Sequence, residues 1–122
     1  MLLDSNIIIY AAQVENVMLR EFIAKHEPVV SALSYVETLG YHRLQEIEKQ
    51  FLTEFFTVSL ILPISQPVIE QAVKLRQIQK MSLGDAIIAG TALSYNYKLV
   101  MRNIKDFQWI GDLICVGKHW FW

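Results

Sequence analysis

Short apolar runs alternate along the chain with longer stretches in which apolar residues recur at helical spacing. The short runs are rich in β-branched and aliphatic residues, which is typical of buried strands. They predict strands at residues 1–3, 29–32, 58–64, 98–101 and 113–116. The stretches between them predict helices that include residues 7–10, 15–26, 34–40, 43–56 and 82–95, with a further helix beginning at Pro67. This alternation predicts an α/β fold with a parallel sheet of four or five strands and helices packed against it.

Proline and asparagine residues set several of these boundaries. Pro28 ends a helical stretch and opens a strand, and Pro63 ends the third strand or places it at a sheet edge. Pro67 suits the first turn of a helix, whereas Asn96 favours a left-handed helix end. The helix that Asn96 would end is apolar nearly all round, so we expect it to lie in the core.

Composition limits the functional classes. The chain has 122 residues, of which 53% are hydrophobic and 19% charged, and its length predicts one domain spanning residues 1–122. The apolar surplus indicates a partner surface, such as that of a homodimer. Eleven basic and twelve acidic residues give a net charge of -1, which disfavours a nucleic-acid-binding module that depends on a basic surface.

The remaining composition favours a cytoplasmic protein. The start, MLLDSNIIIYAA, lacks the basic region of a signal peptide, and no apolar run reaches the roughly 20 residues that cross a bilayer. Cys115 is the only cysteine, so a disulfide within the chain is excluded. It lies in an apolar run, which predicts an inert core thiol. The histidines show no metal-ligand spacing: His26, His42 and His119.

Acidic or amide side chains stand at four places where a strand is expected to pass into a helix. These are Asp4, Glu37, Asp85 and the pair Asn103 and Asp106. Because the carboxyl ends of parallel strands gather along one edge of a sheet, we expect these side chains to meet there. Carboxylates collected at one place hold hard cations such as Mg²⁺. The pattern therefore indicates a metal-dependent enzyme that acts on a phosphate-containing substrate.

Helix capping offers a purely structural interpretation of the same residues. Ser34–Glu37 and Ser82–Asp85 have the spacing of a capping box, in which the serine caps a helix and the acidic residue reaches back. Asn103–Asp106 has the spacing to cap a turn in the same way, and Asp4 suits an N-cap after the first strand. Acidic residues in a first helical turn also suit the helix dipole.

Two observations favour a metal site over capping alone. Capping requires one polar residue at a helix start, but it does not require an acidic residue at every strand exit. Asp85 also lies between Gly84 and an almost wholly apolar helix, where an ionised carboxylate is costly without a partner. A metal ion supplies such a partner.

Four segments in this order resemble the PIN-domain ribonucleases, and most of all the VapC-type toxins of bacterial toxin–antitoxin pairs. The segments are LLDSNIIIY, SALSYVETLG, MSLGDAIIAGTA and LVMRNIKDF. The third is the most specific, the LLDSN of the first is next, and together with the intervening lengths they cover essentially the whole chain. The resemblance implies a PIN-like three-layer α/β/α fold with a central parallel sheet of four to five strands.

The resemblance also assigns roles to residues. It implies that three residues occupy the family's acidic metal-site positions: Asp4, Glu37 and Asp85. The fourth position departs from the family pattern T-x-N/D-x-x-D-F, because Met101 replaces the threonine and Asn103 is neutral. A fourth charge must therefore come from Asp106 or be absent. Whether one or two metals bind depends on this position, and reduced activity is one expected consequence.

The mechanism that the resemblance implies is metal-assisted hydrolysis of RNA phosphodiester bonds, with Mg²⁺ or Mn²⁺ as the ion. The ion lowers the pKa of a bound water and stabilises charge on the phosphate in the transition state. Asn103 is expected to orient a water or phosphate, and Ser5 and Asn6 to order the carboxylates. Three basic residues are candidates for the RNA backbone, although a solvated face is the simpler interpretation: Lys80, Arg102 and Lys105.

Partners follow from the resemblance as well, and two rival functions remain. Family members commonly form homodimers and are silenced by a small antitoxin whose extended segment lies across the site. One rival is a catalytically impaired PIN-like module that binds protein, with which Met101 and Asn103 are compatible. The other is a phosphoryl-transfer or phospho-acceptor domain with a similar sheet. Such proteins usually place two acidic residues close to the first-strand aspartate, where Ser5 and Asn6 stand here.

Overall fold

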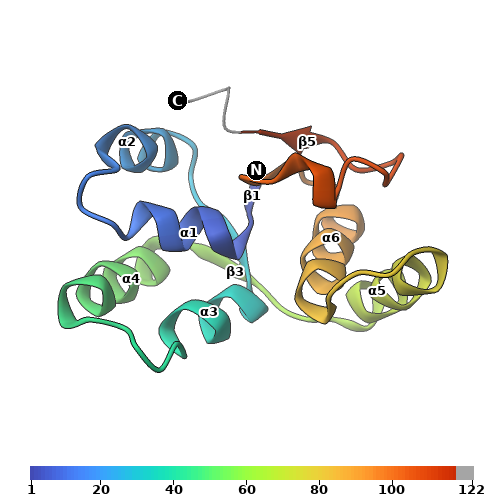
Figure 1. The fold of residues 1–122 in the computed structure, drawn as a ribbon, viewed down its shortest axis with the longest axis horizontal. Helices are drawn as coiled ribbons and strands as arrows, with labels where there is room; N and C mark the ends of the chain where they lie inside the picture. Colours follow the sequence, from blue (N-terminus) through green and yellow to red (C-terminus); the bar gives the residue numbers. More distant parts are fainter. Residues whose placement is uncertain (118–122) are drawn as a thin grey trace.

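A five-stranded parallel sheet forms the centre of the computed structural model, which describes residues 1–117 (Figure 1). The strand order is β3-β2-β1-β4-β5, and every neighbouring pair is parallel. The strands are β1 (Leu2–Leu3), β2 (Val29–Ser31), β3 (Leu60–Leu62), β4 (Leu99–Val100) and β5 (Cys115–Val116). The predicted parallel sheet is confirmed, and β3, which Pro63 follows, lies at an edge as expected.

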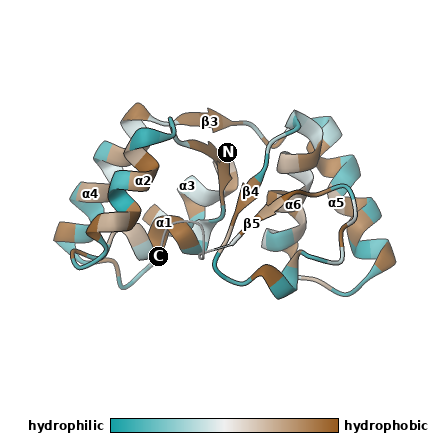
Figure 2. Cartoon of the chain, turned by 90° about the horizontal axis from the view of Figure 1, so that it is seen from above, coloured by the Kyte–Doolittle hydropathy of each residue, from teal (hydrophilic) through white to brown (hydrophobic). Residues whose placement is uncertain are grey.

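Helices cover both faces of this sheet. Within residues 1–117 they are α1 (Ser5–Ala11), α2 (Val17–Lys25), α3 (Ala32–Leu39), α4 (Glu46–Val58), α5 (Gln66–Ile78), α6 (Leu83–Tyr95) and the 3-10 helix η1 (Ile104–Asp106). Figures 1 and 2 show α1 to α4 on one side of the strands and α5 with α6 on the other. The predicted three-layer α/β/α arrangement is therefore confirmed. That residues 1–122 form a single domain stays a prediction.

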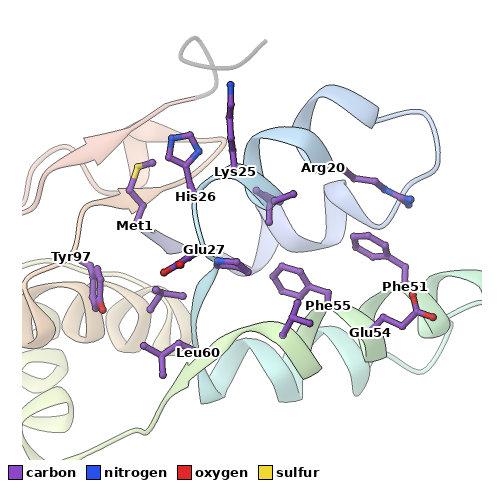
Figure 3. A pocket seen from close by; sticks show the side chains of 15 residues that line it. Met1, Arg20, Lys25, His26, Glu27, Phe51, Glu54, Phe55, Leu60 and Tyr97 are labelled. Atoms are coloured by element: carbon purple, nitrogen blue, oxygen red, sulfur yellow. The ribbon is translucent and has the colours of Figure 1, made fainter.

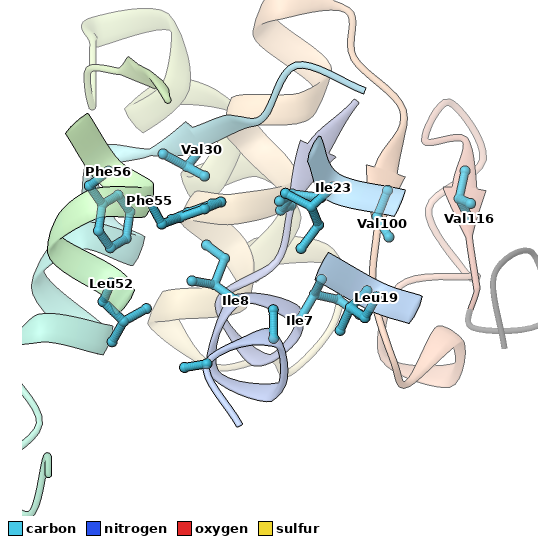
Figure 4. Close-up of a cluster of buried hydrophobic side chains, with 13 residues drawn as sticks. Ile7, Ile8, Leu19, Ile23, Val30, Leu52, Phe55, Phe56, Val100 and Val116 are labelled. Atoms are coloured by element: carbon cyan, nitrogen blue, oxygen red, sulfur yellow. The ribbon is translucent and has the colours of Figure 1, made fainter. Parts of the chain in front are cut away.

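Two hydrophobic cores lie on the two faces of the sheet, because successive side chains of a strand point to opposite faces. One core packs α1, α2 and α4 against Leu3, Val30, Val100 and Val116 (Figure 4). The other packs α5 and α6 against Leu2, Val29, Leu62 and Leu99. Each fully buried aliphatic side chain contributes about 1.5–3 kcal/mol relative to an exposed one. Neighbouring residues of one strand therefore contact helices on opposite faces of the sheet.

Small residues let α6 pack tightly against α5. A Cβ on Gly90 would lie 2.9 Å from the Val68 carbonyl oxygen, so only glycine permits this approach of the two helices. Helix α6 lies in the core, as its apolar sequence predicts, and it ends at Asn96 with φ of 60° in the left-handed region, as expected. Pro67 lies in the first turn of α5, also as expected. Among the helices of residues 1–117, none is both long and apolar enough to span a membrane.

The sheet order creates a switch point between β1 and β4. From β1 the chain continues to β2 on one side, whereas β4 and β5 extend the sheet on the other. In open α/β sheets, ligands bind at the carboxyl ends of the strands beside such a point. The backbone N–H of Asp4 donates to the Val100 carbonyl oxygen at 2.9 Å, so the residue that leaves β1 is fixed against β4. The fold therefore places Asp4 where a ligand site is expected.

Candidate active site

Asp4 is the most buried carboxylate of the carboxyl edge, with 6% of its surface exposed. It occupies the N-cap position of α1, but its side chain makes no capping hydrogen bond. Burial and the charges of Asp85, Glu37 and Asp106 together raise the pKa of Asp4 to about 7, with burial as the largest cause, and a backbone hydrogen bond from Ser5 opposes them. A buried carboxylate surrounded by like charges favours a bound cation or proton. Asp4 is therefore the N-cap of α1 by its backbone position only. Its carboxylate makes no capping hydrogen bond and can take part in the site.

Glu37 reaches the same edge from α3. The predicted capping box of Ser34 with Glu37 is wrong, because α3 begins at Ala32 and its N-cap is Ser31, whose Oγ accepts from the Leu33 N–H at 3.1 Å. The helix starts earlier than expected because β2 ends at Ser31, which can cap directly from the strand end. Glu37 Oε1 instead accepts a hydrogen bond from Ser5 Oγ at 2.7 Å. Its carboxylate is thus tied to the residue that follows Asp4.

Asp85 lies in the first turn of α6. Here the capping prediction is confirmed in part, since Ser82 Oγ accepts from the Asp85 backbone N–H at 3.1 Å. Burial raises the pKa of the Asp85 carboxyl, a hydrogen bond with the Ser82 side chain lowers it, and the charges of Asp106 and Glu37 raise it. Capping and a role in the site are compatible, because the cap uses the backbone N–H of Asp85 and the carboxylate still interacts with the other acids.

The fourth position lies around η1, directly after β4. Asn103 Nδ2 donates to Asp106 Oδ2 at 3.2 Å, so the amide orients the carboxylate. Asp106 is exposed, yet its charge raises the pKa of both Asp4 and Asp85. Met101 is fully buried in the core beneath α6, so its side chain packs inside the protein. A fourth carboxylate is therefore present at this edge, and it is that of Asp106.

The sequence of residues 1–112 matches the family model of the PIN domain. The chain belongs to the PIN domain family. Members of this family are nucleases and generally use divalent metals. None of the curated proteins matches the chain significantly.

Solved structures similar to this PIN domain come from toxin–antitoxin complexes. A toxin–antitoxin complex from Klebsiella pneumoniae holds a chain with 28% identity and a TM-score of 0.72, and the match covers 93% of this chain and 94% of that one. VapBC2 from Rickettsia felis, bound to a DNA fragment from its promoter, gives 25% identity and a TM-score of 0.78. The match covers 95% of this chain and 96% of that one. VapBC-1 from nontypeable Haemophilus influenzae gives 26% identity and a TM-score of 0.77, and the match covers 95% of this chain and 96% of that one. The resemblance to VapC-type proteins is thereby confirmed.

The acidic cluster of this PIN domain has the chemistry of a site for a hard cation. It consists of Asp4, Glu37, Asp85 and Asp106, whose charges act on one another. Within residues 1–117, no three Asp, Glu, His or Cys side chains are arranged to hold one ion together. Mg²⁺, however, takes one or two carboxylates and keeps several waters. The residues present therefore fit an ion that is bound partly through water, and the like charges supply the attraction.

The basic candidates differ in their surroundings. The Arg102 guanidinium lies over the Tyr10 ring of α1, 3.9 Å from its centroid, which is a cation–π contact. Lys105 is exposed in η1, and Lys80 is exposed between α5 and α6. Only Arg102 is thus shown to be held against another element beside the site. The contacts of Lys80, Arg102 and Lys105 with RNA stay predictions.

The sequence pattern did not identify two residues that touch the site. Ser34 Oγ lies 2.8 Å from Ser5 Oγ, and Gly84 packs against the Glu37 carboxylate. Ser34 had the signature of a helix cap, and Gly84 that of a helix start. In both cases only the meeting of separate helices reveals the contact.

Other candidates for chemistry lie elsewhere. Cys115 is partly buried, and burial raises the pKa of its thiol, which agrees with an unreactive side chain. His26 is exposed and one of its ring nitrogens bonds to the Phe22 carbonyl oxygen at 2.9 Å, whereas His42 is exposed on the loop before α4. His119 lies outside the described residues. The histidines that are described therefore offer no alternative to the carboxylates.

A large groove of the described chain does not coincide with the carboxylates. It has a volume of about 1130 Å³ and includes Met1, Val29 and Leu60, which stand at the amino ends of strands (Figure 3). The acids occupy the carboxyl ends of the same sheet. We locate the candidate site by the acids, because carboxylates with raised pKa values at one place are typical of functional sites, whereas an open groove alone is not.

Proposed function

We propose that this PIN domain is a Mg²⁺-dependent endoribonuclease, with Mn²⁺ as an alternative ion, and that it is the toxin of a toxin–antitoxin pair. The observation that carries the proposal is Asp4, a buried carboxylate with a pKa raised to about 7 among three further acids. Such a group favours a cation at the switch point of the sheet. Membership of a nuclease family supplies the reaction class.

Each acid then has a defined task. Asp4, Glu37 and Asp85 would hold the ion, directly or through water. When bound, the ion supplies a water of lowered pKa and stabilises the charge that develops on the phosphate. Asn103 holds Asp106 in place through the hydrogen bond to Oδ2. Asp106, being exposed, faces the solvent from which the RNA backbone approaches.

Two protein partners belong to the proposal. The similar structures are complexes of toxins with antitoxins, which supports a cognate antitoxin for this chain. An apolar groove of about 580 Å³ between α5 and α6 supports a homodimer, because its exposed aliphatic side chains are suited to a protein partner. These side chains include Ile64, Ile69, Val73 and Leu83.

The test is cleavage of structured RNA by the purified protein. We expect cleavage with Mg²⁺ or Mn²⁺, none with a chelator, and none by Asp85→Asn, which should stay folded because Ser82 still caps the α6 backbone. Asp112→Asn is the matched control, because Asp112 is an exposed carboxylate in the loop before β5. Metal-independent cleavage, or full activity of Asp85→Asn, would overturn the proposal. Tight binding to a small protein without cleavage of any RNA would favour the catalytically impaired module, with which the neutral Asn103 is compatible.

A further inference from the structure

A hydrogen-bonded chain of two hydroxyls joins α1 and α3 beneath the acidic cluster. Ser5, the first residue of α1, places its Oγ 2.7 Å from Glu37 Oε1 and 2.8 Å from Ser34 Oγ. Ser34 lies one helical turn before Glu37 on α3 and is 0% exposed. Glu37 itself is exposed as a residue. A long exposed side chain samples many rotamers unless something holds it, so the hydroxyl chain determines where this carboxylate lies.

The direction of the chain follows from the number of protons. An ionised carboxylate only accepts hydrogen bonds, so Ser5 must donate its single hydroxyl proton to Glu37. The Ser5 oxygen is then left to accept, and the donor within reach is the Ser34 hydroxyl. Hydrogen bonds in such a series strengthen one another. Ser34 therefore turns the Ser5 hydroxyl towards Glu37, although it does not touch Glu37 itself.

Gly84 limits the same carboxylate from the opposite side. A Cβ at this position would lie 3.0 Å from Glu37 Oε2 and 3.7 Å from Glu37 Cδ. Such a contact is tighter than nine in ten real Cβ contacts, so the carboxylate would have to shift by a few tenths of an ångström. One oxygen of Glu37 is thus held by a hydroxyl of α1, and the other lies against the bare backbone of α6.

We propose that Ser34 and Gly84 are positioning residues of the active site: Ser34 acts through Ser5 to hold Glu37 in the ion-binding orientation, and Gly84 leaves the space that this orientation requires. The inference rests on the proposed function for what Glu37 binds, but the positioning itself is a property of the contacts. A merely structural interpretation is that Ser34 ties α3 to α1. The two interpretations differ for Gly84→Ala, which displaces the Glu37 carboxylate but leaves the contact between Ser34 and Ser5 intact.

The first experiment measures Mn²⁺ affinity by calorimetry in a double-mutant cycle. Ser34→Ala should weaken Mn²⁺ binding roughly 10-fold, the lower end of what residues behind a metal ligand cost. In a Ser5→Ala protein, the further change Ser34→Ala should have no effect on affinity, because Ser34 acts only through Ser5. Thr91→Val is the control, since Thr91 is an equally buried hydroxyl that donates to the Ile87 carbonyl within α6. Unchanged affinity in Ser34→Ala, or an equal loss with and without Ser5, would overturn the proposal.

The second variant is Gly84→Ala, which separates positioning from folding. Alanine is the better helix former, so this variant should melt no lower than the wild type. It should nevertheless bind Mn²⁺ several-fold more weakly, because Glu37 is displaced. Wild-type affinity in Gly84→Ala contradicts the role of Gly84. This variant also keeps the proposal testable if Ser34→Ala fails to fold.

A crystal structure of the Ser34→Ala protein distinguishes this proposal from the proposed function. We expect Glu37 Oε1 to leave Ser5 Oγ in that structure. If the wild-type protein neither binds Mn²⁺ nor cleaves RNA while Glu37 still moves, the proposed function fails and the positioning chain stands. If Glu37 stays on Ser5 without Ser34, the positioning chain is refuted, whatever the activity of the wild type.

Discussion

The two edges of the sheet differ in both shape and charge. The amino edge carries the large groove, lined by Met1, by strand starts and by aromatic side chains of α4, with Lys25 and Glu54 among its charged residues. The carboxyl edge carries four carboxylates with Asp4 at their centre. Charged residues of both signs are scattered along the first edge, whereas four carboxylates are concentrated at the second, with Arg102 and Lys105 close to them in sequence.

Because of this difference, we assign the candidate site by charge and not by volume. Parallel strands begin at one edge and end at the other, so each edge gathers its own set of loops. At the carboxyl edge, burial and like charges raise the pKa of Asp4 and Asp85. A folded chain retains such unfavourable charges where function requires them. The predictions below test whether the carboxyl edge alone carries the chemistry.

The largest expected effect is on the stability of Asp4→Asn without metal. The raised pKa means that folded Asp4 keeps its proton up to about pH 7, whereas in the unfolded chain it loses the proton near the usual value of 3.8. Between these values the unfolded state binds fewer protons, so stability falls as pH rises. We therefore expect Asp4→Asn to be roughly 4 kcal/mol more stable than wild type above pH 7 and equally stable at about pH 4.

Denaturant unfolding between about pH 4 and a pH above 7 measures this difference in stability between Asp4→Asn and the wild type. The same measurement with Mg²⁺ gives a second comparison of the two proteins. Added Mg²⁺ should stabilise the wild type more at about pH 8 than at about pH 5, because binding requires deprotonated ligands. It should stabilise Asp4→Asn less than the wild type at either pH. A pH-independent difference between the two proteins would mean that Asp4 is not buried among like charges.

Asp85→Asn should lower RNA cleavage by roughly 100-fold or more, equivalent to about 3 kcal/mol of lost transition-state stabilisation. Its melting temperature should be equal to or above that of the wild type, because the change removes one of several mutually repelling charges. Single-turnover cleavage and thermal melting of the same preparation measure both effects. Loss of activity together with loss of folding would leave Asp85 a structural residue.

Asp106→Asn should have a smaller effect. Asp106 is exposed, and Asn103 keeps a hydrogen-bond partner in the amide oxygen of the variant. We expect cleavage to fall about tenfold, as for residues that support a metal site from outside. The pKa of Asp4 should also fall, because one charge that raises it is gone. NMR titration of the Asp4 carboxyl carbon checks this shift, and an unchanged titration would place Asp106 away from the cluster.

The smallest effect belongs to Glu54→Gln at the amino edge. Glu54 lines the large groove, and the substitution is the same loss of a carboxylate charge as in the other variants. Cleavage and Mg²⁺ dependence should match the wild type. A clear loss of cleavage or of its Mg²⁺ dependence would show that both edges contribute to the chemistry. It would contradict the assignment of the site to the carboxyl edge alone.

Much of the fold could be predicted from the sequence, because it depends on local patterns. Apolar runs indicated the strands, Pro63 indicated an edge strand, and Asn96 indicated the end of α6. The start of α3 was predicted too late. The helix starts at Ala32 because its cap is Ser31, at the end of β2, whereas the sequence pattern favoured Ser34.

The site could be predicted only in part, because the contacts that hold it join separate helices. Motif positions placed Asp4 and Asp85 at one sheet edge without any knowledge of distances. The partner of Ser34 is 29 residues away on α1, and no local pattern reveals such a contact. Nor could the sequence show that Asn103 would turn its amide to Asp106. Local rules located the acids, whereas the packing of α1, α3 and α6 decides how they are held.

The most direct test of the account is to locate bound Mn²⁺ by NMR on the ¹⁵N-labelled protein. Mn²⁺ broadens the signals of nearby nuclei, so a titration shows which edge it binds without depending on activity. The account predicts that the amide signals of Asp4, Asp85 and Asp106 disappear first, while those of Glu27, Glu54 and Tyr97 at the amino edge persist. Broadening first at the amino edge, or equally at both edges, would contradict it.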